Sequence, residues 1–394
     1  MTNTDILAAS RALVPWLVET RRHIHGWPEL GKLETETAAY IESRLDELGV
    51  PFRRIGTGVV GRLEGRRGGP TVALRADIDA LPVEETNDLD YRSRRPGIMH
   101  ACGHDAHTAI VLGVASLFSK RPDALAGNLV LLFQPDEEGD GGALPLIEAG
   151  ALEGVDHVLG LHVMPYLDVG EVEVKKGALN GASTSLRIVI GGRGAHGAYP
   201  ELGVDAVLIA SHVVQALHHL VSRYISPLDE AVITIGTISG GLRSNIIADE
   251  VVMTATMRTT SETVRDLLVD RARAVVEGIP ASLGGKGSLE ASYGYAALVS
   301  DDRDVDIVAK VAGELLGKDS VLWKEKPSLG VEDFSFYLKK TRGAFWHLGC
   351  GRGPKGERAG LHSGGFTLDE ECLPIGVAVQ AAAILELMKE GIAT

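Results

Sequence analysis

Three apolar segments that end in polar residues constrain the fold of this chain more than any other feature. They span residues 71–75, 128–133 and 157–163, and each is bounded by turn residues. Helical patterns such as residues 108–118 alternate with them. Continuous apolar runs are typical of strands buried on both faces, and their alternation with helices is typical of a parallel sheet. We therefore predict an α/β fold in which helices flank a mostly parallel, mixed sheet.

A different pattern occupies the middle of the chain. The 394 residues are too many for one ordinary core, so more than one domain is expected. Strand and helix patterns follow each other in the order β-α-β-β-α-β, at residues 186–192, 205–224, 230–240, 250–258, 261–279 and 288–295. This order is typical of the split βαβ fold. We predict an inserted α+β domain at 183–295, within a larger domain made of 1–182 plus 296–394.

Net charge limits the partners of the protein. The formal charge is −14, which argues against nucleic acid and anionic membranes, because both bind basic surfaces. We expect no membrane-spanning run, and residues 1–10 lack the pattern of an export signal. The three cysteines are Cys102, Cys350 and Cys372, an odd and low number that favours reduced thiols. We therefore expect a cytoplasmic protein.

Polar side chains that suit catalysis follow the apolar segments. Asp77 and Asp79 come after the first segment, Glu137 and Glu138 after the second, and His162 lies in the third. In open α/β sheets, ligands bind at the carboxyl ends of the strands. A lone histidine or a Glu-Glu pair is more often a solvated surface feature, so the prediction depends on their joint position at one edge of the sheet.

Metal ligands are the chemistry that these residue types favour. Five residues offer thiolate, imidazole or carboxylate groups: Cys102, His104, Glu138, His162 and His362. Five groups exceed what one tetrahedral ion needs and suit two neighbouring divalent ions. Such a pair lowers the pKa of a water and polarises a carbonyl. Glu137, next to a ligand, is positioned to act as general base.

Several motifs resemble a known family. RRHIHGWPEL, ADIDALP, MHACGHDAHTAIVLG, FQPDEEG, GLHV, GRGAHGAYP, VEDFSFY and LHSGGF occur in that family's order from about residue 21 to 370. The chain resembles the metal-dependent aminoacylase and hippurate hydrolase group, which includes the auxin-amino-acid conjugate hydrolases and is related to the co-catalytic metallopeptidases. The resemblance implies a fold of the two-metal peptidase type and hydrolysis of the amide bond of N-acyl amino acids.

The resemblance also implies residue roles. It assigns the same five ligands and the base Glu137, and it makes Asp77 and Asp79 supports near the metals rather than ligands. In the inserted domain, which resembles the family's lid and dimerisation domain, His196 would stabilise the oxyanion in the partner subunit's active site. Asn245 and Arg258 would hold the substrate's carboxylate. A homodimer follows from this role of His196.

The identity of the metal and of the substrate stays open at this point. The ligand set suits zinc, while manganese, cobalt and nickel are alternatives. Acetyl, benzoyl, indole-acetyl and long acyl groups all fit a small N-acyl amino acid. A metallo-dipeptidase or carboxypeptidase is an alternative enzyme, and a non-catalytic metal-stabilised binding protein is an alternative of another class.

Two further classes of enzyme fit poorly. Gly56, Gly58 and Gly61 spell a dinucleotide-binding pattern, but a turn at 66–69 follows them in place of a helix, so we expect a hairpin. A serine hydrolase would need a Gly-x-Ser-x-Gly elbow, which the sequence lacks.

Overall fold

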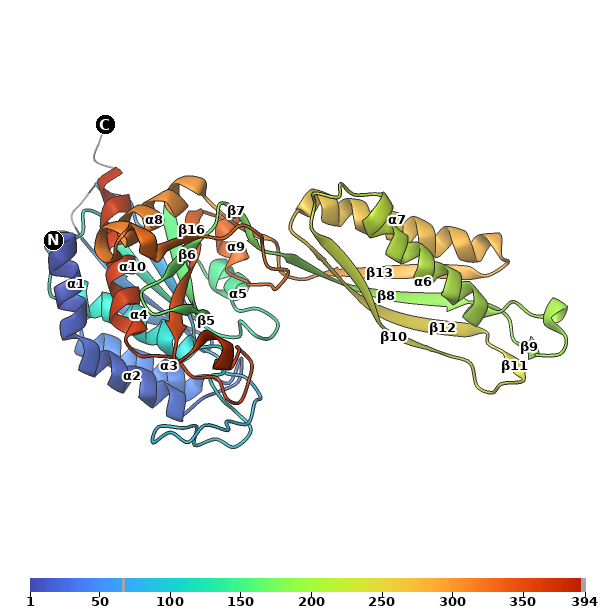
Figure 1. Cartoon of the computed structure of the whole chain (residues 1–394), viewed down its shortest axis with the longest axis horizontal. Coiled ribbons are helices and arrows are strands. Elements are labelled where there is room, and N and C mark those ends of the chain that lie inside the picture. Colours follow the sequence, from blue (N-terminus) through green and yellow to red (C-terminus); the bar gives the residue numbers. More distant parts are fainter. Residues whose placement is uncertain (66–67, 391–394) are drawn as a thin grey trace. The chain divides into compact units, whose positions relative to one another are not determined.

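The computed structural model of the protein describes residues 1–65 and 68–390 (Figure 1). It divides into two compact units. The large unit contains Met1–Gly177, Val299–Glu325 and the chain from Phe336 onward, and the small unit contains Ala178–Leu298 and Lys326–Ser335. Residues 326–335 join the small unit because Ser328 N donates to Leu179 O and Gly181 N donates to Gly330 O, each at 2.9 Å.

A mixed eight-stranded sheet forms the centre of the large unit, in the order β1-β2-β4-β3-β5-β16-β6-β15. The strands are β1 (Phe52–Ile55), β2 (Gly58–Leu63), β3 (Val72–Asp77), β4 (Leu129–Gln134), β5 (His157–Asp168), β6 (Val172–Val174), β15 (Val321–Trp323) and β16 (Arg342–Gly351). The four central strands, β4-β3-β5-β16, are parallel. Three of them, β3, β4 and β5, coincide with the three apolar runs, so the predicted mostly parallel α/β sheet is confirmed.

Helices flank this sheet (Figure 1). They are α1 (Asn3–Ala12), α2 (Val14–Gly26), α3 (Thr35–Glu47), α4 (His104–Ser119), α5 (Ala143–Glu148), α8 (Asp302–Leu316), α9 (Ser335–Leu338) and α10 (Cys372–Glu390), with 3-10 turns at Pro122–Ala124, Lys318–Ser320 and Lys355–Glu357. α4 is buried along nearly its whole length, which explains its apolar composition. Its first turn therefore has a fixed position against β3 and β5.

The C-terminal helix corrects one expectation. Cys372–Lys389 is long and apolar enough to cross a membrane by length and composition alone, whereas we expected no such run. However, 78% of this stretch is buried inside the structure, where α10 packs against α1, α4 and α8. A buried core helix and a membrane-spanning helix have the same apolar composition, because each is surrounded by apolar groups on all sides.

The glycine pattern at 56–61 forms a hairpin. β1 and β2 are antiparallel, and Ile55 pairs with Gly58, so Gly56 and Thr57 form the turn. Gly56 has φ +62, which a residue without a Cβ adopts at no steric cost. No helix begins after this glycine pattern within the described residues 62–65, so the dinucleotide-binding alternative lacks its structural context. The first two residues of the predicted turn at 66–69 lie outside the described residues.

The small unit has the expected β-α-β-β-α-β order. Its elements are β8 (Ala182–Gly191), α6 (Ala206–Arg223), β10 (Ala231–Gly240), β12 (Glu250–Thr259), α7 (Glu262–Ser282) and β13 (Lys286–Tyr293). The sheet order is β10-β12-β8-β13, entirely antiparallel, and both helices bury apolar side chains against it. Short elements complete the chain: β7 (Gly177–Asn180), β14 (Leu298–Ser300), β9 (Ala195–His196), β11 (Ile246–Ile247) and a 3-10 turn at Pro200–Leu202.

Candidate metal centre

The five predicted ligands lie together in the large unit. Their ligand atoms form overlapping groups in which every atom lies within 4.8 Å of the others: Cys102, His104 and His162; Cys102, Glu138 and His362. Cys102 Sγ is 3.3 Å from His162 Nε2, and His362 Nε2 is 3.0 Å from Glu138 Oε1. Because Cys102 belongs to both groups, the five side chains form one cluster.

Glu137, the predicted base, borders this cluster. Its carboxylate forms a further group with His104 and Glu138, again within 4.8 Å, and the residue is 8% exposed. The structure therefore places a carboxylate outside the five-ligand set directly beside it. A general base needs this position, because it must reach a water held by the ligand set.

Unusual backbone conformations bring these side chains together. Gly103 has φ +86 between Cys102 and His104, and a Cβ at this glycine would overlap the side chain of Val163. Asp136, before the two glutamates, has φ +56, and His362 has φ +61. Residues other than glycine rarely adopt such values, and they cluster at functional sites.

Neighbouring groups hold two of these strained residues in place. Asp136 N donates to Glu34 Oε1 at 2.9 Å, and its carboxylate packs so tightly against Gly31 and Gly139 that a Cβ at either glycine would overlap it. His362 N donates to Ala101 O at 2.8 Å, which fixes the loop beside Cys102. The backbone conformation at these residues therefore fixes the positions of the neighbouring ligand side chains.

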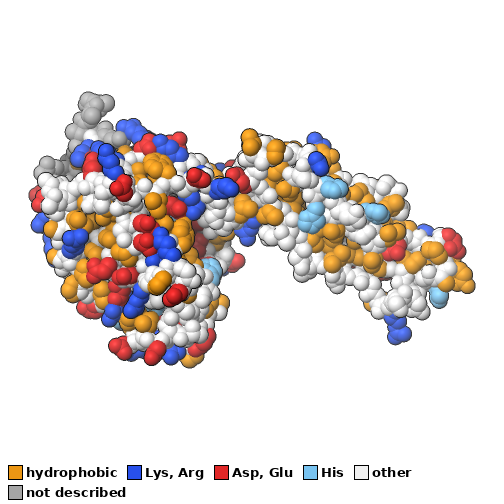
Figure 2. Space-filling model, viewed as in Figure 1, with side chains coloured by type: hydrophobic (Ala, Val, Ile, Leu, Met, Phe, Trp, Pro, Cys, Tyr) orange, Lys and Arg blue, Asp and Glu red, His pale blue; other side chains and the backbone are white. Residues whose placement is uncertain are grey.

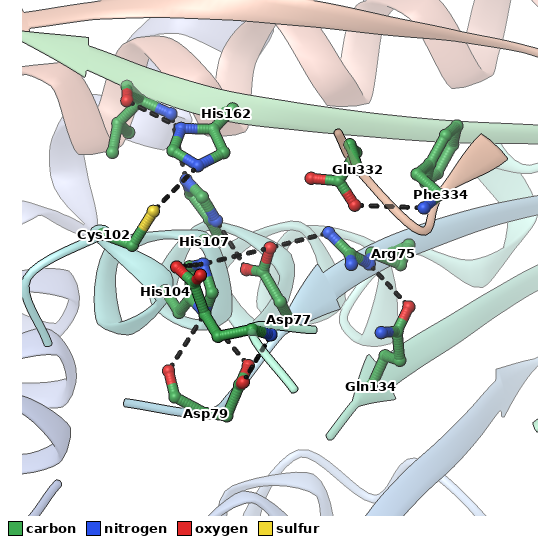
Figure 3. Close-up of polar contacts among 12 residues, drawn as sticks. Arg75, Asp77, Asp79, Cys102, His104, His107, Gln134, His162, Glu332 and Phe334 are labelled. Atoms are coloured by element: carbon green, nitrogen blue, oxygen red, sulfur yellow. Dashed lines mark hydrogen bonds and ion pairs between the residues drawn. The ribbon is translucent and has the colours of Figure 1, made fainter. Parts of the chain in front are cut away.

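The ring orientations of two histidines suit metal binding. His104 Nδ1 donates to Asp79 O at 2.9 Å and lies 3.1 Å from Asp79 Oδ1, which directs its Nε2 towards the cluster (Figure 3). His162 Nδ1 donates to Val163 O at 2.8 Å, which directs its Nε2 towards Cys102. His104 Nε2 is buried and has no hydrogen-bond partner among the described residues. Metal-binding histidines typically donate their other ring N–H to a carboxylate or carbonyl in this way.

The carboxylates around the cluster favour the binding of cations. Burial lowers the pKa of His104, but the Asp77 and Asp79 carboxylates outweigh this and raise it to about 10. Burial, together with Glu138 and Glu137, raises the pKa of the Cys102 thiol well above its ordinary value. The surrounding negative charge therefore retains a proton on His104, and burial together with this charge retains one on Cys102. Divalent ions would take the place of these protons, so the donor set fits two of them.

Asp77 and Asp79 lie next to the predicted ligands, and their role as supports stays a prediction. Asp79 Oδ2 accepts from Glu138 N at 2.9 Å in addition to its contact with His104. Asp77 accepts from Arg75 Nη1 at 2.7 Å and from His107 Nδ1 at 2.6 Å. Although burial alone would raise the pKa of Asp77, Arg75 and the histidines hold it well below its usual range. Asp77 is therefore a permanent anion behind the ligands.

Sequence reasoning assigned no role to His107 or to Arg75. His107 is 1% exposed, and Arg75 Nε donates to Gln134 Oε1 at 2.9 Å inside the sheet. One sequence feature indicated His107: it follows His104 by three residues on a helix, so both project from one face. Nothing in the sequence distinguished Arg75 from an ordinary strand residue.

The motif at residues 21–30 stabilises α4 and does not line the cluster. Arg21 Nε and His25 Nδ1 donate to Asp105 Oδ2 at 2.7 and 2.9 Å, and all three side chains are buried. Asp105 follows His104 in the first turn of α4. This ion pair thus holds the end of α4 that carries His104 and follows Cys102.

The three remaining predicted residues lie in the small unit. His196 in β9 pairs with Ile246 in β11, and Gly197 N donates to Asn245 O at 2.8 Å, so His196 and Asn245 are neighbours. Arg258 lies eight residues along β12 from Glu250, the end of that strand nearest Asn245. Eight residues of strand span roughly 26 Å. Asn245 and Arg258 of one chain therefore lie near opposite ends of β12, and their shared role at a substrate carboxylate stays a prediction.

The fold and the cluster together define a class. A parallel sheet edge that holds thiolate, imidazole and carboxylate ligands for two ions, with a further carboxylate beside them, is the architecture of a dinuclear metallohydrolase. Residues 73–386 match the family model of Peptidase family M20/M25/M40, and the chain belongs to this family. The resemblance noted from the sequence motifs is confirmed.

Individual relatives agree with this assignment. The chain is 42% identical to N-acetyl-L-cysteine deacetylase of Bacillus subtilis strain 168, over 91% of this chain and 84% of the relative. It is 36% identical to IAA-amino acid hydrolase ILR1-like 4 of Arabidopsis thaliana, over 97% and 88% of the two chains. A solved structure of the YXEP protein of Bacillus subtilis, described as a dinuclear metal binding peptidase from the M20 family, has a TM-score of 0.85 at 32% identity and covers 96% and 99%. The protein is therefore an M20-family hydrolase.

Proposed function

We propose that this protein hydrolyses the amide bond of N-acyl amino acids. Two divalent ions would be held by Cys102, His104, Glu138, His162 and His362. The single observation that carries the proposal is Glu137, whose carboxylate lies within 4.8 Å of the His104 and Glu138 ligand atoms. Relatives named as a deacetylase of N-acetyl-L-cysteine and as an IAA-amino acid hydrolase support this substrate class.

Proton transfer is the main task of the protein's own residues. The bound ions would lower the pKa of a water and polarise the scissile carbonyl. Glu137 takes one proton from the attacking water as the C–O bond forms. It returns that proton to the leaving nitrogen as the C–N bond breaks, which releases a carboxylic acid and an amino acid. Zinc is the proposed metal, because a thiolate with imidazoles and carboxylates matches its preferences.

A substrate panel after metal removal tests the proposal. Treatment with a chelator should abolish hydrolysis, and zinc, manganese, cobalt or nickel should be added back separately. We expect restored hydrolysis of N-acetyl, N-benzoyl, N-indole-acetyl or long-chain N-acyl amino acids. A clear preference for dipeptides would favour the metallo-dipeptidase or carboxypeptidase alternative. No hydrolysis of any compound at full metal content would favour a binding protein.

Arg258 is the proposed partner of the substrate's carboxylate. Its Nη1 atom is buried and makes no hydrogen bond within the described part of the chain. This charged donor can therefore form a hydrogen bond with the carboxylate of a bound substrate. We expect Arg258→Ala to raise KM by about 10- to 100-fold with a smaller change in kcat, since a hydrogen bond to a charged group is lost. Steady-state kinetics on an N-acetyl amino acid measures this.

An exposed arginine of the same sheet provides the control. Arg187→Ala should leave KM unchanged, because Arg187 is half exposed and lies near Glu290 at 3.9 Å. Substrates whose carboxylate is replaced by a carboxamide should be poor for the wild type and no worse for Arg258→Ala. Equal use of acid and amide by the wild type would contradict the role of Arg258.

We also propose a cytoplasmic homodimer that associates through the small unit. β10 is an edge strand of its sheet, and residues 231–242 contain no charged side chain. α6 exposes Leu208, His212, His218 and His219. Figure 2 shows few charged side chains on the visible face of this unit, where apolar side chains and histidines gather. The net charge of the chain is −14, so two copies repel each other over most of their surfaces. A surface with few charged side chains avoids this repulsion and can bury its apolar side chains against a second copy.

A further inference from the structure

His107 connects three elements of the large unit beside the ligand cluster (Figure 3). It lies in the first turn of α4, three residues after His104. Its Nδ1 is 2.6 Å from Asp77 Oδ1 at the end of β3, and its Nε2 is 2.9 Å from Val163 N in β5. Its ring is 4.8 Å from the ring of His162, nearly edge to face.

These contacts define the tautomer of His107. The amide N–H of Val163 is only a donor, so His107 Nε2 must accept from it. The proton of the neutral ring is therefore on Nδ1, from which it donates to Asp77. Both ring nitrogens are used in hydrogen bonds, although one of them lies within 4.8 Å of a ring nitrogen of His104. His107 is for this reason a link between elements and not a sixth ligand.

The link replaces missing backbone pairing. β3 and β5 pair in parallel from Val72 with His157 to Arg75 with Gly160, and the pairing stops there, two residues before His162. At the next residue, Val163, the backbone N–H donates to His107 instead of to a strand. The imidazole thus connects β3 to β5 where the ladder no longer does, at the level of the metal ligands.

The other end of the link is rigid as well. Asp77 Oδ2 accepts from Arg75 at 2.7 Å, and Arg75 donates to Gln134 at the end of β4 at 2.9 Å. All of these side chains are almost completely buried. A continuous chain of hydrogen bonds therefore runs from β4 through β3 and α4 to β5, the elements that precede or carry four of the five ligands.

We propose that His107 is a positioning residue that sets the separation between Cys102 and His104 on one side of the cluster and His162 on the other. This inference rests on the metal centre of the proposed function. Cys102 Sγ and His162 Nε2 are 3.3 Å apart, a distance that depends on how α4 is held against β5. Loss of His107 frees both sides to move, so the affinity for the ions falls even though every ligand remains.

Metal binding, measured apart from activity, tests this. His107→Phe keeps a ring but loses both hydrogen bonds, and His107→Gln keeps at most one of them. We expect metal affinity, measured by competition with a chromophoric chelator, to fall about 10- to 100-fold in His107→Phe and less in His107→Gln. The Co²⁺-loaded protein should also show a shifted or weakened absorption band from the Cys102 thiolate. The melting temperature of the metal-free protein measures any general loss of stability.

His157 supplies a matched control on the same strand. It is buried, and its Nδ1 is 2.8 Å from Asp304 Oδ2, so His157→Gln also removes a buried His–Asp contact from β5. This variant should bind Co²⁺ with wild-type affinity and spectrum. If His107→Phe does not fold, the metal affinity and Co²⁺ spectrum of His107→Gln test the proposal.

Two results would overturn the proposal. One is wild-type affinity and spectrum in the folded His107 variants, and the other is an equal loss of affinity in His157→Gln. Failure of the proposed function can be distinguished from failure of this proposal. If the wild type binds two ions but hydrolyses no substrate, the metal affinities of the variants can still be compared.

Discussion

Replacing Glu137 with glutamine should lower kcat by about 10²- to 10⁴-fold while both ions remain bound, because this range is typical of a lost general base. Glutamine keeps the size of the side chain, and it cannot accept a proton from water at neutral pH. Glu137 lies outside the set of five predicted ligands, so its substitution should spare the metal. Steady-state kinetics and metal analysis of the same sample measure the two effects.

The neighbouring residue makes a matched control for this substitution. Glu138→Gln changes the same kind of side chain one position along the chain. However, Glu138 groups with Cys102 and His362 as a ligand, so this variant should lose bound metal. Unchanged turnover in Glu137→Gln would remove Glu137 as the base. Loss of metal from both variants would instead make Glu137 a ligand.

The ligand cluster was predictable because strand ends and residue types are both visible in the sequence. Glu138 follows an apolar run and His162 lies in one, and parallel strands bring their carboxyl ends to one edge. Cys102 and His104 lie at the start of a helical pattern. His362 is 200 residues beyond His162 and follows the apolar residues 344–349, and the family resemblance supported its assignment. The split βαβ order of the small unit was equally visible, since its strands and helices differ clearly in period.

Other features depend on tertiary structure that no local pattern encodes. The role of His107 arises because the pairing of β3 with β5 ends at Gly160, and the sequence does not show where a ladder ends. The family resemblance assigned Asn245 and Arg258 to one carboxylate. Strand β12 separates them, and that distance follows from the direction of the strand, which residue types do not reveal.

The last prediction concerns His196, which is a neighbour of Asn245 and lies near the end of β12 that is far from Arg258. Ala198 N donates to His196 Nδ1 at 3.1 Å, so in the neutral ring the proton is on Nε2, which can donate to a developing oxyanion. His196→Ala should therefore lower kcat by about 10²- to 10³-fold, the usual effect of losing one such donor. If His196 acts on substrate in the partner subunit, the defect should be reversible by mixing.

Mixed dimers test this directly. A His196→Ala chain keeps Glu137, and a Glu137→Gln chain keeps His196, so a dimer with one chain of each kind has one complete active site. Random assembly makes half of the dimers mixed, and one of their two sites is intact, so activity should recover to about one quarter of the wild-type value. A mixture of Glu137→Gln with Glu137→Ala should recover nothing. Recovery near zero in the first mixture, with mixed dimers shown to form, would mean that His196 serves its own chain or none, and the proposed need for a second copy would be wrong.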